Sequence, residues 1–468
     1  MTHDEVFWRS ALDLAAAIRA KQVSPVEIAE AVLARIEALN PRLNAFCLVT
    51  SDIALRDARE AEIAVIKGEP IGPLHGVPVS LKDVIFTKGL RTTGGSRLFA
   101  EAVPEEDAIA VGRLRAAGAV ILGKTNTSEL GHKAVTESPL FGVTRNPWNL
   151  ERTPGGSSGG ASAQLAAGMG QLAVGTDGGG SIRIPSAFAG VSGIKAHFGR
   201  VPAWPLSPMG TVAHVGPMAR TVADVALMLT VLARSDPRDW YSLPYDATDW
   251  TQSLGLGVKG LRIAYSPRLG YVKYVHPEVE ARVADAVKVL EGLGARVDQV
   301  DPGFVDARDC FWVHWTSGAF NALRKLPAEK FALLENGLKH AFEAGSRHSL
   351  AAFQDAVAVR TAIGERMRQF HLEWDLLATP SLAVPAFPVG RVAPEAPTGT
   401  EDDWTWWTPF SYPFNLTQQP AMSVPCGFTK DGLPVGLQLV AAPYREDLAL
   451  RAAQAFQQTT DHLRRPDL

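Results

Sequence analysis

Cysteine is scarce in this sequence. Only three cysteines occur among its 468 residues, Cys47, Cys310 and Cys426, and they lie far apart. An odd number at such distances excludes a disulfide framework, and it excludes a metal site built on closely spaced cysteines. We therefore expect a protein of a reducing compartment, the cytoplasm, that uses neither a metal nor another cofactor.

A surplus of charge of either sign is missing as well. Lys and Arg number 46 against 49 Asp and Glu, which gives a formal net charge of −3, and no basic run stands out. This balance excludes the electrostatic footprint of nucleic-acid binding and a polybasic membrane patch. The first ten residues, MTHDEVFWRS, carry acids and lack the apolar stretch of a secretory leader. We expect neither a nucleic-acid nor a membrane partner.

No apolar run of the membrane-spanning kind stands out either. The segment 153–176 is uncharged, but it is rich in Gly and Ser rather than in Leu and Ile, so we expect it to be buried in protein. Apolar residues make up 46% of the chain and charged residues 20%. These values are ordinary for a globular protein, and they predict that the chain folds throughout.

Short apolar stretches alternate with helical patterns after Pro73. GVPVSL, AVILG and QLAVG are separated by helical segments, and LRIAYS, a helix over 277–293 and ARVDQV repeat the rhythm. This alternation predicts an α/β fold, a single large domain with a central mixed, mostly parallel, twisted sheet covered by helices on both faces.

We expect one domain over 1–468, built from three parts. Residues 1–70 form an N-terminal helical part, 71–235 the catalytic core, and 236–468 the remaining strands, helices and loops of the substrate cleft. The irregular stretches 236–250 and 389–404 are interpreted as surface loops, because strand patterns of one kind lie on both sides of the first.

Two motifs in the sequence are misleading. GAVILGKT, residues 118–125, matches the phosphate-loop pattern, yet its apolar middle suits a buried strand with Lys124 near the strand end. GGSSG, residues 155–159, matches the nucleophile elbow of the α/β-hydrolases, which needs a strand directly before it and a later histidine. A loop with two prolines precedes it, and His197 and His214 are the nearest later histidines. We expect neither nucleotide binding nor an elbow.

Three clusters together carry chemistry. GVPVSLKD places Lys82 at the end of an apolar strand, TPGGSSGGAS places Ser157 in a glycine turn, and TDGGGSIRIP places Ser181 behind three glycines. Consecutive glycines can turn successive backbone N–H groups into one concavity, as an oxyanion hole requires. Taken singly, each cluster is more often a turn or a surface lysine, and the conjunction is what favours a site.

Lys82 is the candidate base for a serine nucleophile. Burial disfavours a charged lysine, and lowering its pKa from about 10.4 to about 7 costs about 4 to 5 kcal/mol, which a large domain can sustain locally. Strand alternation points Asp83 away from the face of Lys82, so the neighbouring carboxylate need not keep the lysine protonated.

With these three clusters, the chain resembles the amidase signature family. The motifs that carry the resemblance run over nearly the whole sequence: SLKD, GKTNTSELG, FGVTRNPWN, PGGSSGGAS, GTDGGGSIRIPSAFAGVSGIK, DLLATPSLAVPAF, PFNLTQQPAMSVPCGF and LPVGLQLV. Ser157 and Ser181 also stand 24 positions apart, as the family pattern requires.

The resemblance implies roles for these residues. Ser181 is the nucleophile, Ser157 is a relay serine with a cis peptide bond, and Lys82 is the base, while Ser158 is not the relay. Backbone N–H groups of Gly178, Gly179, Gly180 and Ser181 hold the oxyanion. Apart from the resemblance, we expect a monomer or a homodimer.

The resemblance further implies that Gly131 and His132 line the substrate cleft. Two departures from the family pattern put the substrate geometry in question. Gly178 stands where the family often has Ile, Thr or Ser, and Gln418 replaces the usual Gly in NLTQQP.

The main alternative within this resemblance is the glutaminase A subunit of a tRNA-dependent amidotransferase. That subunit grips glutamine with an Arg and an Asp. Arg360 falls at the Arg position of this chain, but Thr408 occupies the Asp position, so one of the two grips is missing.

Trp404, Trp406 and Trp407 bring three indoles to a segment that should run toward the cleft, and we expect Trp407 to contact substrate. The predicted function is a stand-alone amidase, a hydrolase of linear carboxylic amides with apolar or aromatic groups, such as an arylamide or a fatty amide. Esters and carbamates are further candidate substrates. A catalytically dead binding scaffold is the least favoured interpretation.

Overall fold

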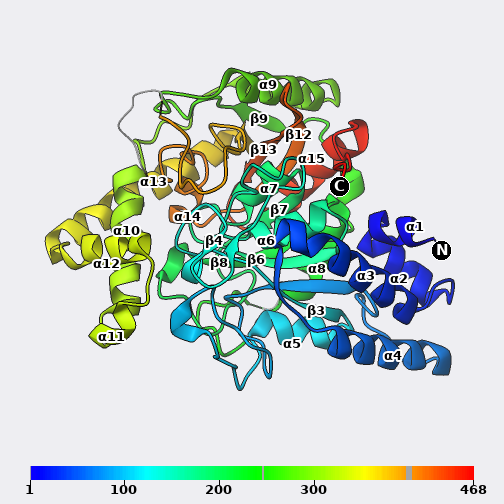
Figure 1. The fold of residues 1–468 in the computed structure, drawn as a ribbon. Helices are drawn as coiled ribbons and strands as arrows, with labels where there is room; N and C mark the ends of the chain where they lie inside the picture. The colour runs from blue at the N-terminus through cyan, green and yellow to red at the C-terminus, as the bar shows by residue number, and fades with distance from the viewer. Residues whose placement is uncertain (1, 245–246, 397–402) are drawn as a thin grey trace.

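One continuous sheet runs through the computed structural model, which describes residues 2–244, 247–396 and 403–468. Within these residues the sheet has eleven strands, and Figure 1 shows it at the centre of the molecule. The spatial order is β1 (Phe46–Val49), β3 (Val120–Thr125), β2 (Pro78–Lys82), β6 (Leu172–Asp177), β8 (His214–Ala219), β7 (Ser192–Lys195), β12 (Ala421–Phe428), β13 (Pro434–Ala441), β11 (Leu376–Pro380), β9 (Arg262–Tyr265) and β10 (Arg296–Gln299). A small separate hairpin joins β4 (Glu137–Ser138) and β5 (Gly142–Val143).

The single α/β domain with a mixed sheet is confirmed, but its mostly parallel character is wrong. Among the described strands, four neighbouring pairs are parallel and six are antiparallel. The reason lies in the connections. Only five residues separate β12 from β13, and a parallel neighbour needs a crossover of a dozen residues or more.

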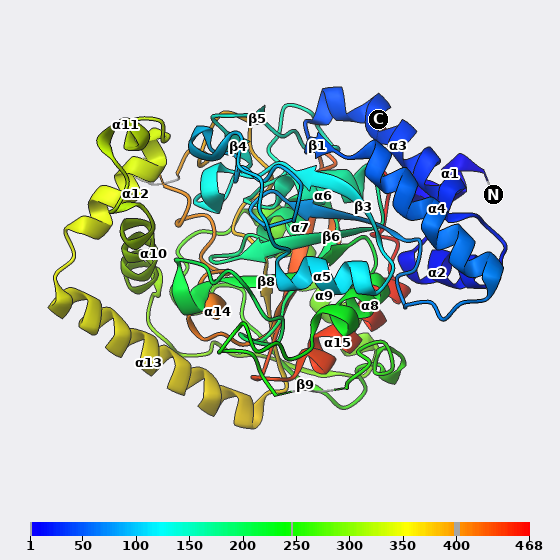
Figure 2. The same cartoon turned by 90° about the horizontal axis from the view of Figure 1, so that it is seen from below.

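Helices cover both faces of the sheet (Figures 1 and 2). On one face α6 (Gly159–Ala166) packs beside α7 (Arg183–Ala189), and on the other α8 (Val222–Leu232) packs between α5 (Ile109–Ala116) and α15 (Glu446–Thr459). The remaining helices are α1 (His3–Trp8), α2 (Ala11–Arg19), α3 (Pro25–Leu43), α4 (Ser51–Lys67), α9 (Pro277–Gly292), α10 (Arg308–Leu323), α11 (Ala328–Phe331), α12 (Asn336–Ser346), α13 (Leu350–Glu373) and α14 (Pro413–Leu416). Short 3₁₀ turns occupy Arg97–Phe99, Glu129–Gly131, Gly210–Val212 and Leu254–Leu256.

Local signals at the helix ends agree with the sequence. Ser24 caps α3 through bonds from the N–H groups of Val26 and Glu27, and Pro25 fills the first turn, as expected for a capping box. The predicted helix over 277–293 is α9. The described residues of the stretches 236–250 and 389–404 form turns and irregular backbone, and 245–246 and 397–402 lie outside the described residues.

Helices α10 to α12 form an arm at one side of the domain, yellow-green in Figure 1. Helix α10 packs against α12 and α13, and its side chains Phe311 and Trp315 reach the glycines that follow β6. No helix in the described part of the chain is long and apolar enough to cross a membrane.

Candidate active site

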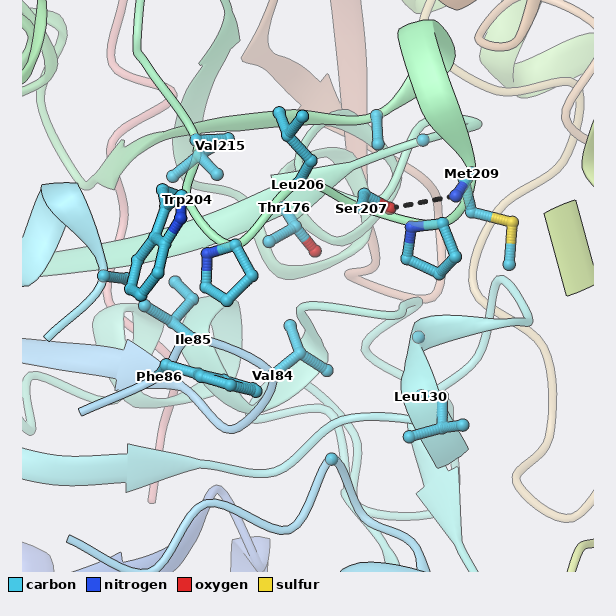
Figure 3. A pocket seen from close by; sticks show the side chains of 18 of the residues that line it. Val84, Ile85, Phe86, Leu130, Thr176, Trp204, Leu206, Ser207, Met209 and Val215 are labelled. Carbon is cyan, nitrogen blue, oxygen red and sulfur yellow. Dashed lines mark hydrogen bonds between the residues drawn. The ribbon is translucent and has the colours of Figure 1, made fainter. Parts of the chain in front are cut away.

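A cavity of about 780 Å³ opens where β2 and β6 end. These two strands are parallel neighbours, so their carboxyl ends meet at one edge of the sheet, which is where α/β folds place their sites. Both glycine–serine clusters reach this cavity, because Ser157 and Ser181 line it together with Thr176. Figure 3 shows Thr176 in the cavity among apolar side chains that include Val84 and Leu206.

Lys82 is the last residue of β2 and is fully buried. Its Nζ lies 2.7 Å from Ser157 Oγ and 2.8 Å from Thr176 Oγ1. Burial lowers the pKa of Lys82 to about 7, although the negative charge of Asp177 acts to raise it. A lysine of this pKa is substantially neutral near pH 7, and it can accept a proton from the hydroxyl beside it.

Asp83 faces away from Lys82, which confirms the prediction from strand alternation. Its carboxylate accepts the backbone N–H of Thr93 at 3.1 Å and that of Gly95 at 3.4 Å. Thr176 was not among the predicted site residues. It stands inside the quoted GTDGGGS motif, and the pairing of β2 with β6 could have identified it.

The two adjacent serines have different surroundings. The Gly156–Ser157 peptide bond is cis, as the resemblance implied, and Ser157 Oγ meets Lys82. Ser158 instead donates its hydroxyl to the Thr176 carbonyl at 3.2 Å and its backbone N–H to the Ser181 carbonyl at 3.3 Å. Ser158 therefore ties the two clusters together through its hydroxyl and its backbone N–H.

The backbone around Ser181 is fixed by Asp177. This carboxylate accepts the N–H groups of Gly180 at 2.8 Å and Ile182 at 3.2 Å, and it pairs with Arg183 at 2.9 Å. Burial alone would raise the pKa of Asp177, but the Arg183 guanidinium and the hydrogen bond from Asn415 hold it well below its ordinary range.

This arrangement corrects the predicted oxyanion set. The N–H of Gly180 is already donated to Asp177, so it is not available to a substrate oxygen. Across the described residues, the N–H groups of Gly178, Gly179 and Ser181 donate to no acceptor. Ser411 Oγ donates to the Gly179 carbonyl at 2.7 Å, which fixes the orientation of this peptide from behind.

Gly131 and His132 separate in the structure. Gly131 lines the cavity with φ +74°, and a Cβ there would lie 3.3 Å from Ser157 Oγ. His132 does not line the cavity, which differs from the expectation that it lines the substrate cleft. Its Nδ1 lies 3.0 Å from the Glu129 carbonyl and its Nε2 lies 2.9 Å from Glu335 Oε1, and these two acceptors hold the ring away from the cavity.

Trp407 does not line the cavity either, and its contact with substrate stays a prediction. Its indole is fully buried, stacks on Phe188 with centroids 5.6 Å apart, and donates its N–H to the Val392 carbonyl. The tryptophans that do line the cavity are Trp204, Trp240 and Trp315. They come from segments that carry no motif, which is why the sequence did not single them out.

No lysine or arginine of the described residues lines the cavity. Its three lining carboxylates all bind internal donors: Asp83 and Asp177 as above, and Asp239 the N–H groups of Ala203 and Tyr241 at 2.9 Å each. The walls are otherwise rich in apolar side chains, among them Ile85, Phe86, Leu130, Trp204, Leu206 and Val215 (Figure 3). In the described part of the chain, no group of His, Cys, Asp and Glu is arranged to hold a metal ion.

The glutamine-gripping positions do not face the cavity. Arg360 donates to the Leu416 carbonyl at 2.8 Å and to Thr211 Oγ1 at 2.9 Å. Thr408 is fully buried, and its hydroxyl donates to the Trp404 carbonyl at 3.1 Å. Neither side chain is placed to hold a glutamine.

The two misleading motifs are resolved as expected. Residues 120–125 form the fully buried strand β3, so Lys124 belongs to a strand and not to a phosphate loop. Burial lowers the pKa of His197 to about 3 and, aided by the nearby charge of Lys195, holds that of His214 well below its ordinary value. His214 Nδ1 lies 2.9 Å from the Val212 carbonyl, and the partner of Ser157 is Lys82.

A family model described as Amidase matches residues 27–450. The chain belongs to the amidase family. Among members of the family, an acylamidase of Rhodococcus erythropolis is 40% identical over 463 residues, which are 98% of this chain and 96% of that protein. The A subunit of a glutamyl-tRNA(Gln) amidotransferase from Chloroflexus aggregans is 38% identical, over 97% of this chain and 96% of that protein. The solved structure of a bacterial aryl acylamidase of the amidase signature family matches with a TM-score of 0.91 at 32% identity, over 97% of this chain and 96% of that one.

Proposed function

We propose that the protein is a stand-alone amidohydrolase that cleaves neutral, apolar amides through an acyl-Ser181 intermediate. The observation that carries this proposal is the contact of 2.7 Å between Lys82 Nζ and Ser157 Oγ, beside a cavity that Ser181 also lines. Burial of a charged lysine lowers the stability of the folded protein. A buried lysine whose partner is the hydroxyl of Ser157 suits a general base that activates the nucleophile Ser181 through that hydroxyl.

In the proposed reaction neutral Lys82 takes the proton of Ser157. Ser157 in turn takes the proton of Ser181 while Ser181 Oγ forms a bond to the acyl carbon. The oxygen of the tetrahedral intermediate gains negative charge, which the N–H groups of Gly178, Gly179 and Ser181 stabilise. Three donors fixed in advance serve this purpose, because the charge develops without reorganisation of the site.

The same protons then move in reverse. Protonated Lys82 returns its proton to Ser157, which gives one to the nitrogen of the leaving amine as the C–N bond breaks. Water next gives a proton to Ser157, which passes one to Lys82, while the water oxygen forms a bond to the acyl carbon. The proton then returns from Lys82 through Ser157 to Ser181 Oγ as the bond between this oxygen and the acyl carbon breaks and the carboxylic acid leaves. Thr176 Oγ1 accepts an N–H of Lys82 at 2.8 Å, which orients the lysine lone pair toward Ser157.

The cavity favours substrates without charge. No described lysine or arginine lines it, and its carboxylates are satisfied internally, so a charged substrate would lose its hydration without a partner. Apolar walls and a volume of about 780 Å³ suit an aromatic or long aliphatic group. The acylamidase and aryl acylamidase relatives support an acyl amide or an aryl amide, with esters and carbamates as further candidates.

The likeness to an amidotransferase A subunit makes glutamine the second candidate substrate. Glutamine brings a carboxylate and an ammonium group, and the cavity offers the carboxylate no described cationic side chain. Arg360 is engaged with Leu416 and Thr211. We therefore place this chain apart from the glutaminases, as an enzyme that works without a second protein, in a reducing cytoplasm that suits its three free cysteines.

A hydrolysis panel tests the proposal. Anilides and long-chain amides should be cleaved with the highest kcat/KM, and glutamine should not be cleaved above the level of the Ser181→Ala variant. Glutamine hydrolysis that exceeds anilide hydrolysis would overturn the substrate assignment. Equal activity of wild type and Ser181→Ala on anilides would overturn the proposed nucleophile.

A further inference from the structure

Trp315 occupies the space that a side chain at position 178 would need. A Cβ on Gly178 would lie 2.7 Å from Cζ3 and 3.3 Å from Cη2 of Trp315. The φ of Gly178 lies outside the left-handed region, so its backbone conformation would accept alanine. Glycine is required here by the space that the indole takes, and not by the backbone.

The indole of Trp315 is fixed on several sides. Its N–H donates to the His132 carbonyl at 3.2 Å, and the side chain is 5% exposed. It stacks on Phe311 with ring centroids 5.6 Å apart and meets Trp404 edge-on at 5.8 Å. An indole held in this way cannot move aside without breaking a hydrogen bond and two ring contacts.

The same aromatic cluster supports the next glycine. A Cβ on Gly179 would lie 2.7 Å from Cζ of Phe311 and 3.0 Å from Cη2 of Trp404. Two of the three residues that carry the free N–H groups are therefore packed against rings from α10 and from the segment around Trp404. Trp315 differs from the other two rings because it also lines the cavity.

We propose that Trp315 is a positioning residue for the glycine segment 178–180 and, through its cavity-facing surface, a determinant of substrate specificity. The proposal rests on the proposed function, because it assumes that the N–H groups of Gly178 and Gly179 bind the oxyanion. Donors in an oxyanion hole act only when they are held in place, and a displacement of about 1 Å can cost about 100-fold in rate. Gly178 and Trp315 thus form a complementary pair, in which the small residue and the large one each require the other.

A pair of single variants and their combination test this idea. With a 4-nitroanilide of a neutral acyl group, Gly178→Ala should lower kcat about 30-fold, because the new Cβ displaces either the segment or the indole. Trp315→Leu should lower kcat about 10-fold and change KM for bulky substrates. In the Trp315→Leu background, Gly178→Ala should cost less than about threefold, since the space is now free.

Matched controls separate this effect from general damage. Gly364→Ala on α13 makes the same chemical change where no atom lies within 4 Å of the new Cβ, and Trp312→Phe alters another tryptophan of α10. Both should retain kcat and KM, and thermal melting should show that all variants fold. If Gly178→Ala costs the same factor in both backgrounds, the pairing is wrong.

Labelling by a fluorophosphonate separates a failure of the proposed function from a failure of the role of Trp315. Wild type that forms no adduct at Ser181 would contradict the proposed function itself. Wild type that is labelled, together with additive effects of the two substitutions, would contradict only the role of Trp315. The proposal is supported when Gly178→Ala slows labelling of Ser181 in the wild-type background but changes the rate by less than about threefold in the Trp315→Leu background.

Discussion

Two fully buried lysines lie at the ends of neighbouring parallel strands, and they differ in their partners. In the register of β2 and β3, Lys82 is opposite Thr125 and Leu81 is opposite Lys124. Lys82 Nζ meets two hydroxyl groups, those of Ser157 and Thr176. Lys124 Nζ meets the Ile85 carbonyl and the hydroxyls of Thr87 and Thr92, both at 3.0 Å.

Burial alone therefore does not make a lysine a general base. A carbonyl oxygen can only accept, and the Thr87 and Thr92 hydroxyls already donate to the Ile85 and Leu90 carbonyls, so Lys124 stays a donor. The Ser157 hydroxyl can instead donate its proton to Lys82. Burial lowers the pKa of Lys82 to about 7 and that of Lys124 to about 8, and the charge of Asp83 acts against the shift at Lys124. Lys124 holds the loop after β2 in place, while Lys82 contacts a residue of the cavity.

The largest expected effect is the loss of activity in Lys82→Met. Without the base, kcat on an anilide should fall by a factor of about 1,000 or more, since general-base catalysis is commonly worth about 100- to 10,000-fold. The folded pKa of Lys82, about 7, lies below its unfolded value of 10.5, so its burial costs about 4 to 5 kcal/mol at pH 7 and less as the pH rises toward 10.5. Thermal melting at pH 7 should therefore show Lys82→Met to be no less stable than wild type. A clear loss of stability there would contradict this account of Lys82.

Lys124→Met should show the opposite behaviour. The change leaves three oxygens without their donor and the buried Asp83 without a nearby positive charge, so the free energy of unfolding should fall by about 2 to 4 kcal/mol. Urea denaturation measures this loss. The kcat of the folded fraction should stay within about threefold of wild type, and a collapse of kcat at unchanged stability would remove the distinction between the two lysines.

Thr176→Val tests whether the partners of Lys82, and not only its burial, make it a base, because the change removes one of its two hydroxyl partners. The variant keeps the shape of the side chain but removes the acceptor that lies 2.8 Å from Nζ. We expect kcat to fall about 10-fold with KM little changed, because the lone pair of Lys82 loses its fixed orientation. Steady-state kinetics with Thr176→Ser, which restores the hydroxyl, provides the control and should recover most of the rate.

The smallest expected effect lies at the outer part of the cavity. Phe86 and Trp240 line it and are 44% and 74% exposed, so they can cover the far end of a long apolar substrate. Trp240→Ala should raise KM about threefold for long-chain anilides, leave kcat unchanged, and leave short-chain anilides unaffected. Leu350→Ala, at an equally exposed site on α13, is the control. A fall in kcat for all chain lengths would instead tie Trp240 to the chemistry.

The sequence predicted the strands of this fold better than their directions. β2 and β3 are fully buried and rich in apolar residues, so both are easy to recognise in the sequence. Direction depends on how the chain returns to the sheet. The hairpin of β12 and β13 could have been inferred from its five-residue connection, but the neighbours of β7 and β8 could not, because no short loop joins them to β12 or β6.

The residues of the candidate site were also predicted with unequal success. Lys82, Ser157 and Ser181 belong to local motifs; Ser157 and Ser181 line one cavity, and Lys82 contacts Ser157. His132 and Trp407 do not line the cavity. Glu335 orients His132 and Phe188 orients Trp407, and each partner lies about 200 positions away along the chain. Contacts between such distant residues depend on packing, which no local pattern encodes.

The central claim is that Lys82 activates Ser181 through Ser157. The rate of fluorophosphonate labelling, measured by intact mass against pH, tests it most directly. The account predicts one adduct at Ser181, lost in Ser181→Ala, with a rate that rises about tenfold per pH unit below about 7 and levels off above it, because only neutral Lys82 can accept the proton. In Lys82→Met this pH dependence should vanish along with most of the rate. An adduct on another residue, or an unchanged pH profile in Lys82→Met, would contradict the account.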